Sequence, residues 1–419
     1  MDCYFTESIT WSKISSGTIA FRYKPKGHIF DVAGTSIFSD EKWRYYILGF
    51  CNSTVALEIA KVLSPTLNYE VGHIAGFPII FSEEHEKEIT ELVKNNIEIC
   101  KADWDSYETS WDFKSNMLIN GHDSLAESLH FIKKVCDERR ERLRNNSYRI
   151  NELFIEIYGL QDVVKPDIDE KDICIRKYDE NQLVKEYLSY AVGCIMGRYS
   201  LDKEGIVCAS NKIDFTNYSK FRPDDDAIVP ICDDEYFDDD IVGKVQDFIR
   251  HTFGSEKYTE NLQLIATALN GSGTPIEKLR NYFYTEFYSD HCAMYSGNVG
   301  RRPIYWQFDS GKKNGFKCLV YIHRYQADTV ARIRTDYVHE QQARYRTAIE
   351  EIENRINNVT GSEKVKLSKK LSDLKQQEED IHSYEEKVHH IADQMINIDL
   401  NDGVRNNYEL FKEILAKVK

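Results

Sequence analysis

Basic and aromatic residues alternate along one stretch of the chain, between Asn298 and Arg346. This stretch holds ten Arg and Lys residues against four Asp and Glu, although the protein of 419 residues carries a formal net charge of -15. A local excess of cations is typical of a surface that neutralises the phosphates of a nucleic acid. The cations expected at this surface are Arg301, Arg302, Lys312, Lys313, Arg324, Arg332 and Arg334. The first chemistry that the sequence predicts is therefore the binding of duplex DNA.

Both kinds of residue in this stretch also have a structural interpretation. Any single arginine could instead form an ion pair, either at the surface or in the interior. For Tyr305, Trp306 and Tyr325 we expect packing in a core rather than stacking on bases. On that interpretation the aromatic residues form the scaffold that orients the arginines.

An acidic segment occupies residues 224–240, where nine Asp and Glu residues occur without a Lys or Arg. Carboxylate clusters bind calcium when they alternate along a loop that has a central glycine and a closing glutamate. That pattern is missing from this segment. We therefore expect a solvated, flexible loop here.

Several enzyme signatures fail when they are tested against the sequence. A zinc-protease helix needs His-Glu-x-x-His, but Ala343 stands at the fifth position after His339-Glu340. The glycines around Lys312 and Lys313 are misplaced for a phosphate-binding loop. Methylation of a flipped base would need a proline-proline-aromatic loop, and no two of the eight prolines are adjacent. The sequence yields no catalytic, cofactor-binding or metal-binding residue.

Composition and cysteine spacing favour a globular protein of the cytoplasm. Nowhere do 18 apolar residues run together, so no membrane span is predicted, and no apolar leader follows Met1. The ten cysteines are scattered without a Cys-x-x-Cys pair, which speaks against a disulfide framework or a zinc knuckle. A reducing compartment fits this pattern.

Short strands and turns dominate the segment from Trp11 to Ile80. Alternation with period two predicts a strand at 18–23, and helical spacing from Tyr45 to Leu63 predicts one or two short helices. A compact mixed α/β unit is the simplest arrangement. Four of its cations lie on or beside turns that could enter a DNA groove, namely Lys13, Arg22, Lys24 and Lys26.

Helices are predicted for most of the remaining chain. Ser82 offers an N-cap for one helix, and apolar spacing predicts another between Leu125 and Tyr158. A capping box at Thr274-Pro275-Ile276-Glu277 starts the second of two helices joined by a tight turn. The aromatic residues of that helix favour core packing over a DNA-reading helix-turn-helix. Two apolar runs separated at 358–362 predict an antiparallel helical hairpin, so the expected class is α+β: a mixed α/β domain followed by a largely helical region ending in this hairpin.

Several blocks of the sequence resemble one protein family. Three blocks are similar to the target-recognition domain of large adenine-specific DNA methyltransferases. They are Asp31-Val32-Ala33-Gly34-Thr35-Ser36-Ile37-Phe38, Leu48-Gly49-Phe50-Cys51-Asn52-Ser53 and Pro65-Thr66-Leu67-Asn68-Tyr69-Glu70-Val71-Gly72-His73-Ile74. Four further blocks narrow the resemblance to the PglX family of BREX phage-defence systems. They are Asp103-Trp104-Asp105-Ser106-Tyr107-Glu108-Thr109-Ser110-Trp111-Asp112-Phe113, Arg302-Pro303-Ile304-Tyr305-Trp306, His323-Arg324-Tyr325 and Arg332-Ile333-Arg334-Thr335-Asp336-Tyr337. The resemblance covers nearly the whole chain, from Tyr4 to Val404.

The resemblance implies four parts and a function. The parts are a target-recognition domain at 1–82, a helical spacer at 83–160, a mixed, mainly helical domain with the basic segment at 161–336, and the hairpin and tail at 337–419. The implied function is sequence-specific recognition of duplex DNA by the carboxy-terminal part of an adenine-N6 methyltransferase in phage defence. The family's S-adenosylmethionine loop and proline-proline-tyrosine loop are expected in an amino-terminal methyltransferase domain or partner chain. This chain is therefore expected to hold no cofactor and to be inactive alone, with other BREX proteins as further partners.

Other functions stay open alongside DNA recognition. The hairpin and the acidic segment are poor DNA ligands, so the chain could be an interaction platform for other defence proteins. A phage inhibitor that mimics DNA could bind the same basic surface with carboxylates at phosphate-like spacing. An independent enzyme is the least supported alternative, because no nucleophile, metal cluster or cofactor loop was found.

Overall fold

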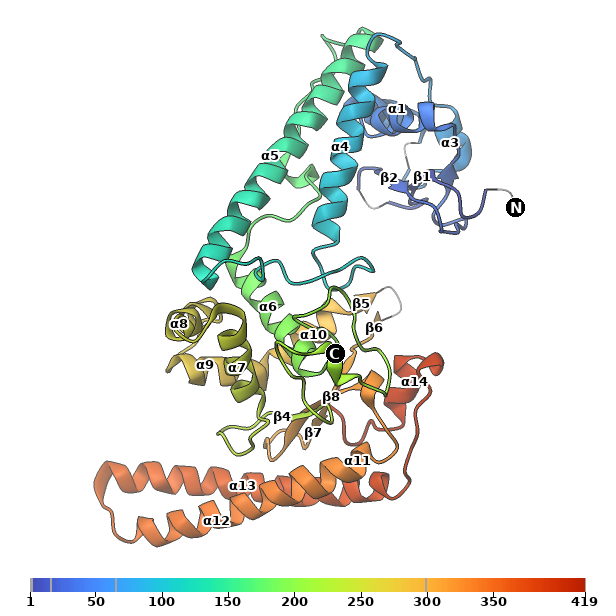
Figure 1. The fold of residues 1–419 in the computed structure, drawn as a ribbon. Coiled ribbons are helices and arrows are strands. Elements are labelled where there is room, and N and C mark those ends of the chain that lie inside the picture. The colour runs from blue at the N-terminus through green and yellow to red at the C-terminus, as the bar shows by residue number, and fades with distance from the viewer. Residues whose placement is uncertain (1–2, 16, 65, 298–299, 419) are drawn as a thin grey trace. The chain divides into compact units, whose positions relative to one another are not determined.

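The structure is a computed structural model that describes residues 3–15, 17–64, 66–297 and 300–418. Most of these residues are helical, and three small antiparallel sheets lie among the helices (Figure 1). This content confirms the predicted α+β class. Three residues named above, Met1, Pro65 and Asn298, lie outside the described residues.

The chain divides into two compact units. Unit 1 comprises Met1–Asp105 and Lys133–Tyr178, and unit 2 comprises Ser106–Ile132 and Asp179–Lys419. The finer division into four parts stays a prediction. Each unit is described by itself below.

A small sheet with an aromatic core forms one side of unit 1. Its strands are β1 (Ser8–Trp11), β2 (Phe21–Lys24) and β3 (Ser36–Ile37), in the order β2-β1-β3. Trp11 and Phe21 are buried, and the indole Nε1 of Trp11 donates to the Tyr69 carbonyl oxygen at 2.9 Å. The strand expected at 18–23 is thus present but starts and ends slightly later.

Short helices complete this core, as the spacing from Tyr45 to Leu63 predicted. They are α1 (Glu41–Cys51), α2 (Thr54–Leu63) and α3 (Val71–Ala75). The break between the first two follows from Ser53, whose hydroxyl caps α2 by accepting from the Ala56 amide at 3.2 Å. No single described helix is long and apolar enough to cross a bilayer, although α1 and α2 together pass that test with a 75° bend between them.

Two long helices pass through unit 1. The second, α5 (Leu125–Tyr158), has the predicted bounds and begins in unit 2. The first, α4 (Glu86–Trp104), starts later than expected, after a turn in which the Ser82 carbonyl accepts from the Glu86 amide. A 3₁₀ turn, η1 (Glu170–Asp172), follows α5.

A central helix and four helices after it form the first layer of unit 2. They are α6 (Glu180–Ile195), α7 (Ile241–Phe253), α8 (Tyr258–Ala268), α9 (Pro275–Thr285) and α10 (Phe287–Met294), with the turn η2 (Phe215–Asn217) between α6 and α7. Nearly every side chain of α6 from Leu183 onward is buried. Leu279, Tyr282 and Phe283 of α9 are also buried, which confirms core packing for the helix pair.

The capping box at the start of α9 gives a first testable prediction. The Thr274 hydroxyl accepts from the Glu277 amide at 3.3 Å, and the Glu277 carboxylate accepts from the Thr274 amide at 2.6 Å. Thr274→Ala is expected to lower the free energy of unfolding by about 1 kcal/mol in urea titrations. Thr267→Ala is the control, because the exposed Thr267 hydroxyl only donates back to the Gln263 carbonyl within α8. Equal destabilisation by both changes would contradict a capping role.

A second sheet holds the aromatic residues of the basic segment. Strands β4 (Ile228–Pro230), β8 (Lys317–Tyr321) and β7 (Tyr305–Asp309) pair antiparallel in the order β4-β8-β7. Tyr305 and Trp306 are fully buried and Tyr325 nearly so, which confirms that they are core residues. A separate hairpin of β5 (Ser296–Gly297) and β6 (Gly300–Arg301) precedes this sheet.

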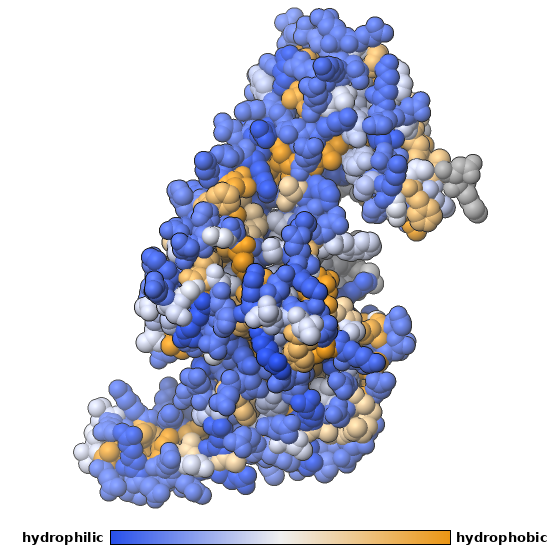
Figure 2. All heavy atoms as spheres, viewed as in Figure 1, coloured by the Kyte–Doolittle hydropathy of each residue, from blue (hydrophilic) through white to orange (hydrophobic). Residues whose placement is uncertain are grey.

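The carboxy-terminal part of unit 2 contains the predicted helical hairpin. Helices α12 (His339–Ile356) and α13 (Gly361–Ala392) contact each other along their lengths (Figure 1). On the face visible in Figure 2 the hairpin is mostly hydrophilic, with apolar residues along the seam between the helices. The remaining elements are η3 (Ile322–Arg324), α11 (Thr329–Arg332), the π-helical turn η4 (Ile333–Val338), η5 (Leu400–Asp402) and α14 (Val404–Glu409).

The acidic segment at 224–240 is only in part the solvated loop expected from the sequence. Five of its nine acidic residues are exposed, namely Asp225, Asp233, Asp234, Glu235 and Asp238. Asp224 and Asp240 are buried, and each accepts backbone N–H groups, so each closes a turn or caps a helix. Asp240 also pairs with Arg280 at 3.0 Å, and Asp226 pairs with Arg332 at 2.7 Å. The prediction was wrong for Asp224, Asp226 and Asp240, because charge density alone does not reveal which carboxylates have backbone donors or cations to accept from.

Candidate nucleic-acid interface

Two of the four cations predicted in unit 1 are engaged in contacts of their own. Lys13 pairs with Glu70 at 3.0 Å. The Lys24 ammonium donates to the Ser36 hydroxyl at 3.1 Å and lies 4.8 Å from the centroid of the Phe30 ring. Burial lowers the pKa of Lys24. Both side chains therefore have a structural role within the unit.

Of the four cations predicted in unit 1, Arg22 and Lys26 are exposed. Lys26 stands in the turn between β2 and the following segment, next to Gly27, whose φ of 92° suits only glycine well. Arg22 lies on β2, near the Cys100 and Cys174 thiols, whose sulfur atoms are 3.9 Å apart. The hydrogen bond from Cys100 and the charge of Arg22 lower the pKa of Cys174 to about 6. Arg22 thus already influences a thiol pair, whereas Lys26 faces solvent.

In unit 2, the arginine pair is exposed. Arg301 ends β6 and Arg302 follows it, with the Arg302 amide donating to the Tyr295 carbonyl at 2.8 Å. This backbone bond holds the pair at the base of the β5–β6 hairpin, immediately before the buried strand β7. Both guanidinium groups are therefore presented to solvent from a fixed backbone.

Lys312 and Lys313 form a second exposed pair. They lie at the opposite end of β7, in the turn that joins β7 to β8. Gly315 packs this turn against α13, because a Cβ at that position would lie 2.6 Å from the Gln377 carbonyl oxygen. The Lys313 ammonium donates to the Gln376 amide oxygen, whereas Lys312 lies in the exposed part of the turn. The five residues of β7 therefore lie between the two pairs in the sequence.

The other three predicted cations of unit 2 are engaged by partners within the fold. Arg324 is only 6% exposed and donates to the carbonyl oxygens of Met196, Asp224 and Asp225. Arg332 pairs with Asp226, and Arg334 pairs with Glu385 of α13 at 2.6 Å. These three residues join the basic segment to the acidic segment and to the hairpin. The exposed cations of the predicted set are thereby reduced to Arg22, Lys26, Arg301, Arg302, Lys312 and Lys313.

Sequence reasoning missed one feature of unit 2, a cavity of about 330 Å³ beside α6 and α10. Its lining includes Tyr107 and Glu108, which belong to one of the blocks quoted above only for its resemblance. No pattern in the sequence marks Glu108 as buried, because its burial depends on helices that follow about 75 or more residues later. Within the described residues, no group of three or more His, Cys, Asp and Glu side chains is arranged to hold a metal ion.

Comparisons with known proteins give consistent results along the whole chain. The chain is 36% identical over 416 residues to the adenine-specific methyltransferase PglX of Lacticaseibacillus casei, covering 96% of this chain and 34% of the relative. It is also 36% identical over 451 aligned residues to the adenine-specific methyltransferase BrxX of Escherichia coli, covering 100% of this chain and 37% of the relative. The chain thus spans about a third of the length of the curated relatives it matches. No protein-family model matches it.

Proposed function

The chain is homologous along its whole length to about a third of the adenine-specific methyltransferases PglX and BrxX, and from this premise we propose that it recognises duplex DNA for such an enzyme. Unit 1 contains the target-recognition part and unit 2 adds phosphate contacts. The observation that carries the proposal is the exposed Arg301-Arg302 pair, held on a fixed backbone in an otherwise acidic chain. We place the site of action of this chain in the cytoplasm, where the DNA is.

The proposal assigns different tasks to the exposed and the internal cations. Arg301, Arg302 and Lys312 neutralise phosphates, which positions the duplex but does not read its sequence. Lys26, in a turn of unit 1, is placed where a base edge or a phosphate could be contacted. Arg324, Arg332 and Arg334 keep the sheet, the acidic segment and the hairpin together, and are left out of the proposed surface.

Salt dependence of binding tests the proposal directly. Three phosphate contacts predict that the logarithm of the association constant falls with the logarithm of salt concentration at a slope of about -2.7. Fluorescence anisotropy with a labelled duplex, measured over a series of salt concentrations, gives that slope. Binding that does not respond to salt, or no binding at all, would overturn the proposal.

A second candidate function is an interaction platform for other proteins of the defence system. The acidic segment and the hydrophilic hairpin would suit it. Within α12 and α13, however, Val365 is the one large apolar side chain that is exposed, which leaves little apolar surface for a stable partner. DNA recognition is therefore the function that the exposed cations support better.

Methyl transfer is proposed to need the remaining two thirds of the relatives' length. The glycines after α8 do not fit a cofactor loop, because they join two helices rather than a strand and a helix, and the Glu277 side chain fills the space beside Gly273. We expect no transfer of tritium from labelled S-adenosylmethionine to DNA by this chain alone. Cofactor-dependent turnover by the purified chain would contradict this part of the proposal.

A further inference from the structure

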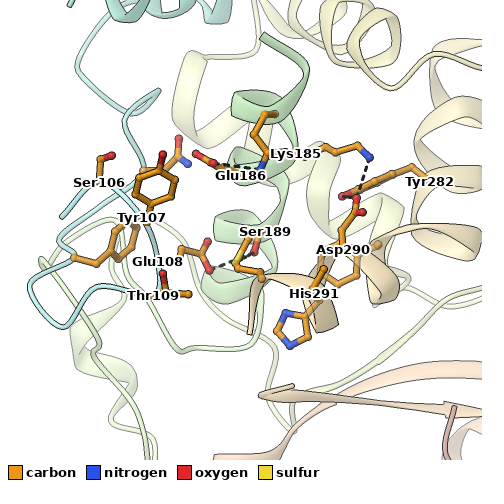
Figure 3. A pocket seen from close by; sticks show the side chains of 16 residues that line it. Ser106, Tyr107, Glu108, Thr109, Lys185, Glu186, Ser189, Tyr282, Asp290 and His291 are labelled. Atoms are coloured by element: carbon orange, nitrogen blue, oxygen red, sulfur yellow. Dashed lines mark hydrogen bonds and ion pairs between the residues drawn. The ribbon is translucent and has the colours of Figure 1, made fainter. Parts of the chain in front are cut away.

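The cavity in unit 2 has aromatic walls and an acidic lining (Figure 3). It lies between the segment 106–116 and helices α6, α9 and α10. The rings that contribute to its walls are those of Tyr107, Phe113, Tyr282 and Phe287. Its volume of about 330 Å³ is near the lower limit for pockets that bind small organic molecules.

Glu108 is the feature of this cavity that points to a ligand. The residue is only 8% exposed. One of its carboxyl oxygens, Oε2, accepts from the Ser189 hydroxyl at 3.2 Å and from the Tyr295 hydroxyl at 3.4 Å. The other oxygen, Oε1, is buried and has no hydrogen-bond partner among the described residues. A buried acceptor without a donor is unfavourable, and a ligand that donates to it would recover the lost hydrogen-bond free energy.

The charges around the cavity select the sign of the ligand. Lys185, the one basic side chain of the lining, is held by Asp290 at 2.9 Å and by Glu286 at 3.4 Å. Glu186 stands beside Glu108 on the cavity wall (Figure 3), and its carboxylate accepts from the Gln182 amide at 3.2 Å. Even with the Arg198 guanidinium that faces Glu108 counted, the carboxylates of Glu108, Glu186, Asp290 and Glu286 outnumber the cations, and a phosphate-bearing ligand would be repelled. An organic cation would be attracted both by these groups and by the faces of the aromatic rings.

We propose that this cavity binds a small planar organic cation of the guanidinium or amidinium class, which donates to Glu108 Oε1. A planar cation is favoured over an ammonium group because it is less strongly hydrated and can stack on the aromatic walls while its N–H groups reach a carboxylate. This site is independent of the proposed DNA surface, since none of the exposed cations discussed above contributes to it.

Binding is coupled to the loss of a proton. Burial raises the pKa of Glu108 to about 7, so the carboxyl is partly protonated at neutral pH. A cation requires the ionised form, and its affinity is expected to rise with pH between about 6 and 8, by close to tenfold per unit where the acid form dominates. A proton should be released on binding over the same range.

The shifted pKa values of the groups around Glu108 lie outside the pH range in which this proton release is expected. Burial raises the pKa of the tyrosines and the cysteine that face it above the neutral range, and burial lowers the pKa of His291 to about 3. Arg198 remains a cation and Glu186 faces Glu108 from α6. The groups that face Glu108 are Glu186, Tyr190 and Cys194 of α6, Arg198 and Tyr199 after it, and Tyr295 and Tyr305.

Calorimetric titration of the full chain tests the proposal with two ligands of the same shape. Benzamidine is a planar cation and benzamide is its uncharged analogue. We expect benzamidine to bind with a Kd below about 1 mM and benzamide to bind at least about tenfold more weakly. Titrations in buffers of different ionisation enthalpy should show proton release with benzamidine. Equal binding of the two ligands, or no binding of either, would overturn the proposal.

Variants assign the effect to Glu108. E108Q keeps the shape of the side chain but cannot ionise, so benzamidine should bind at least about tenfold more weakly and without pH dependence. E260Q removes an exposed carboxylate of α8, away from the cavity lining, and should bind as the unchanged chain does. Undiminished binding by E108Q would refute the assignment. If E108Q fails to fold, pH-independent affinity of the unchanged chain would refute it instead.

Discussion

Replacing Arg301 and Arg302 together with glutamate is expected to weaken binding to duplex DNA by roughly 10- to 100-fold at moderate salt. The change removes two phosphate contacts and adds two repulsions at the same place. The slope of affinity against salt concentration should also become shallower by about 1.8, because each lost phosphate contact contributes about 0.9. Fluorescence anisotropy over a salt series measures both quantities in one experiment.

A matched control is available on α13. Lys364 and Lys366 are also exposed and positively charged, and their reversal to glutamate changes the net charge by the same amount. They stand ten or more residues before Gln376, the contact of Lys313, which is about 15 Å along the helix. That variant should bind within about twofold of the unchanged chain, because charges beyond a Debye length of about 10 Å are largely screened. Equal loss of binding in the two variants would mean that net charge, rather than the arginine pair, controls binding. Unchanged binding in the Arg301 and Arg302 variant would remove this pair from the interface.

Sequence patterns predicted those parts of the fold that depend on local spacing. The bounds of α5, the capping box at Thr274 and the helical hairpin all follow from periodicity and capping within short windows. The burial of Tyr305 and Trp306 was also expected, since core packing was favoured over stacking on bases for these large aromatic side chains. These features need no knowledge of distant residues.

The candidate interface could be predicted only in outline. Arg324 and Arg301 look equivalent in the sequence, yet Arg324 is enclosed by three carbonyl groups while Arg301 is exposed. The difference is set by partners about 100 residues away, such as Asp224, and one sequence does not reveal them. The same reason explains why the cavity around Glu108 was missed. Counting charges therefore located the basic segment from Asn298 to Arg346 but overestimated how many of its cations are exposed.

The largest effect on stability is expected at the acidic segment, from Asp240→Ala. The Asp240 carboxylate is fully buried, caps α7 by accepting from the Val242 amide, and pairs with Arg280 of α9. Its removal leaves the Arg280 guanidinium without its carboxylate partner, with the Cys232 and Asp234 carbonyl oxygens as remaining acceptors. Loss of one partner of a buried pair typically costs about 3 to 5 kcal/mol, which should appear in urea titrations as a lower free energy of unfolding.

A neighbouring residue and a second substitution separate the possible causes of that loss. Asp238 lies in the same acidic segment but is exposed, so Asp238→Ala should change stability by no more than about 0.5 kcal/mol. Arg280→Met combined with Asp240→Ala should cost less than the sum of the single changes, because the second change no longer leaves a charge without its partner. Additive costs would show that helix capping, rather than the ion pair, dominates. A small effect of Asp240→Ala would mean that this carboxylate is replaceable by water, and that the acidic segment is closer to the solvated loop than its contacts indicate.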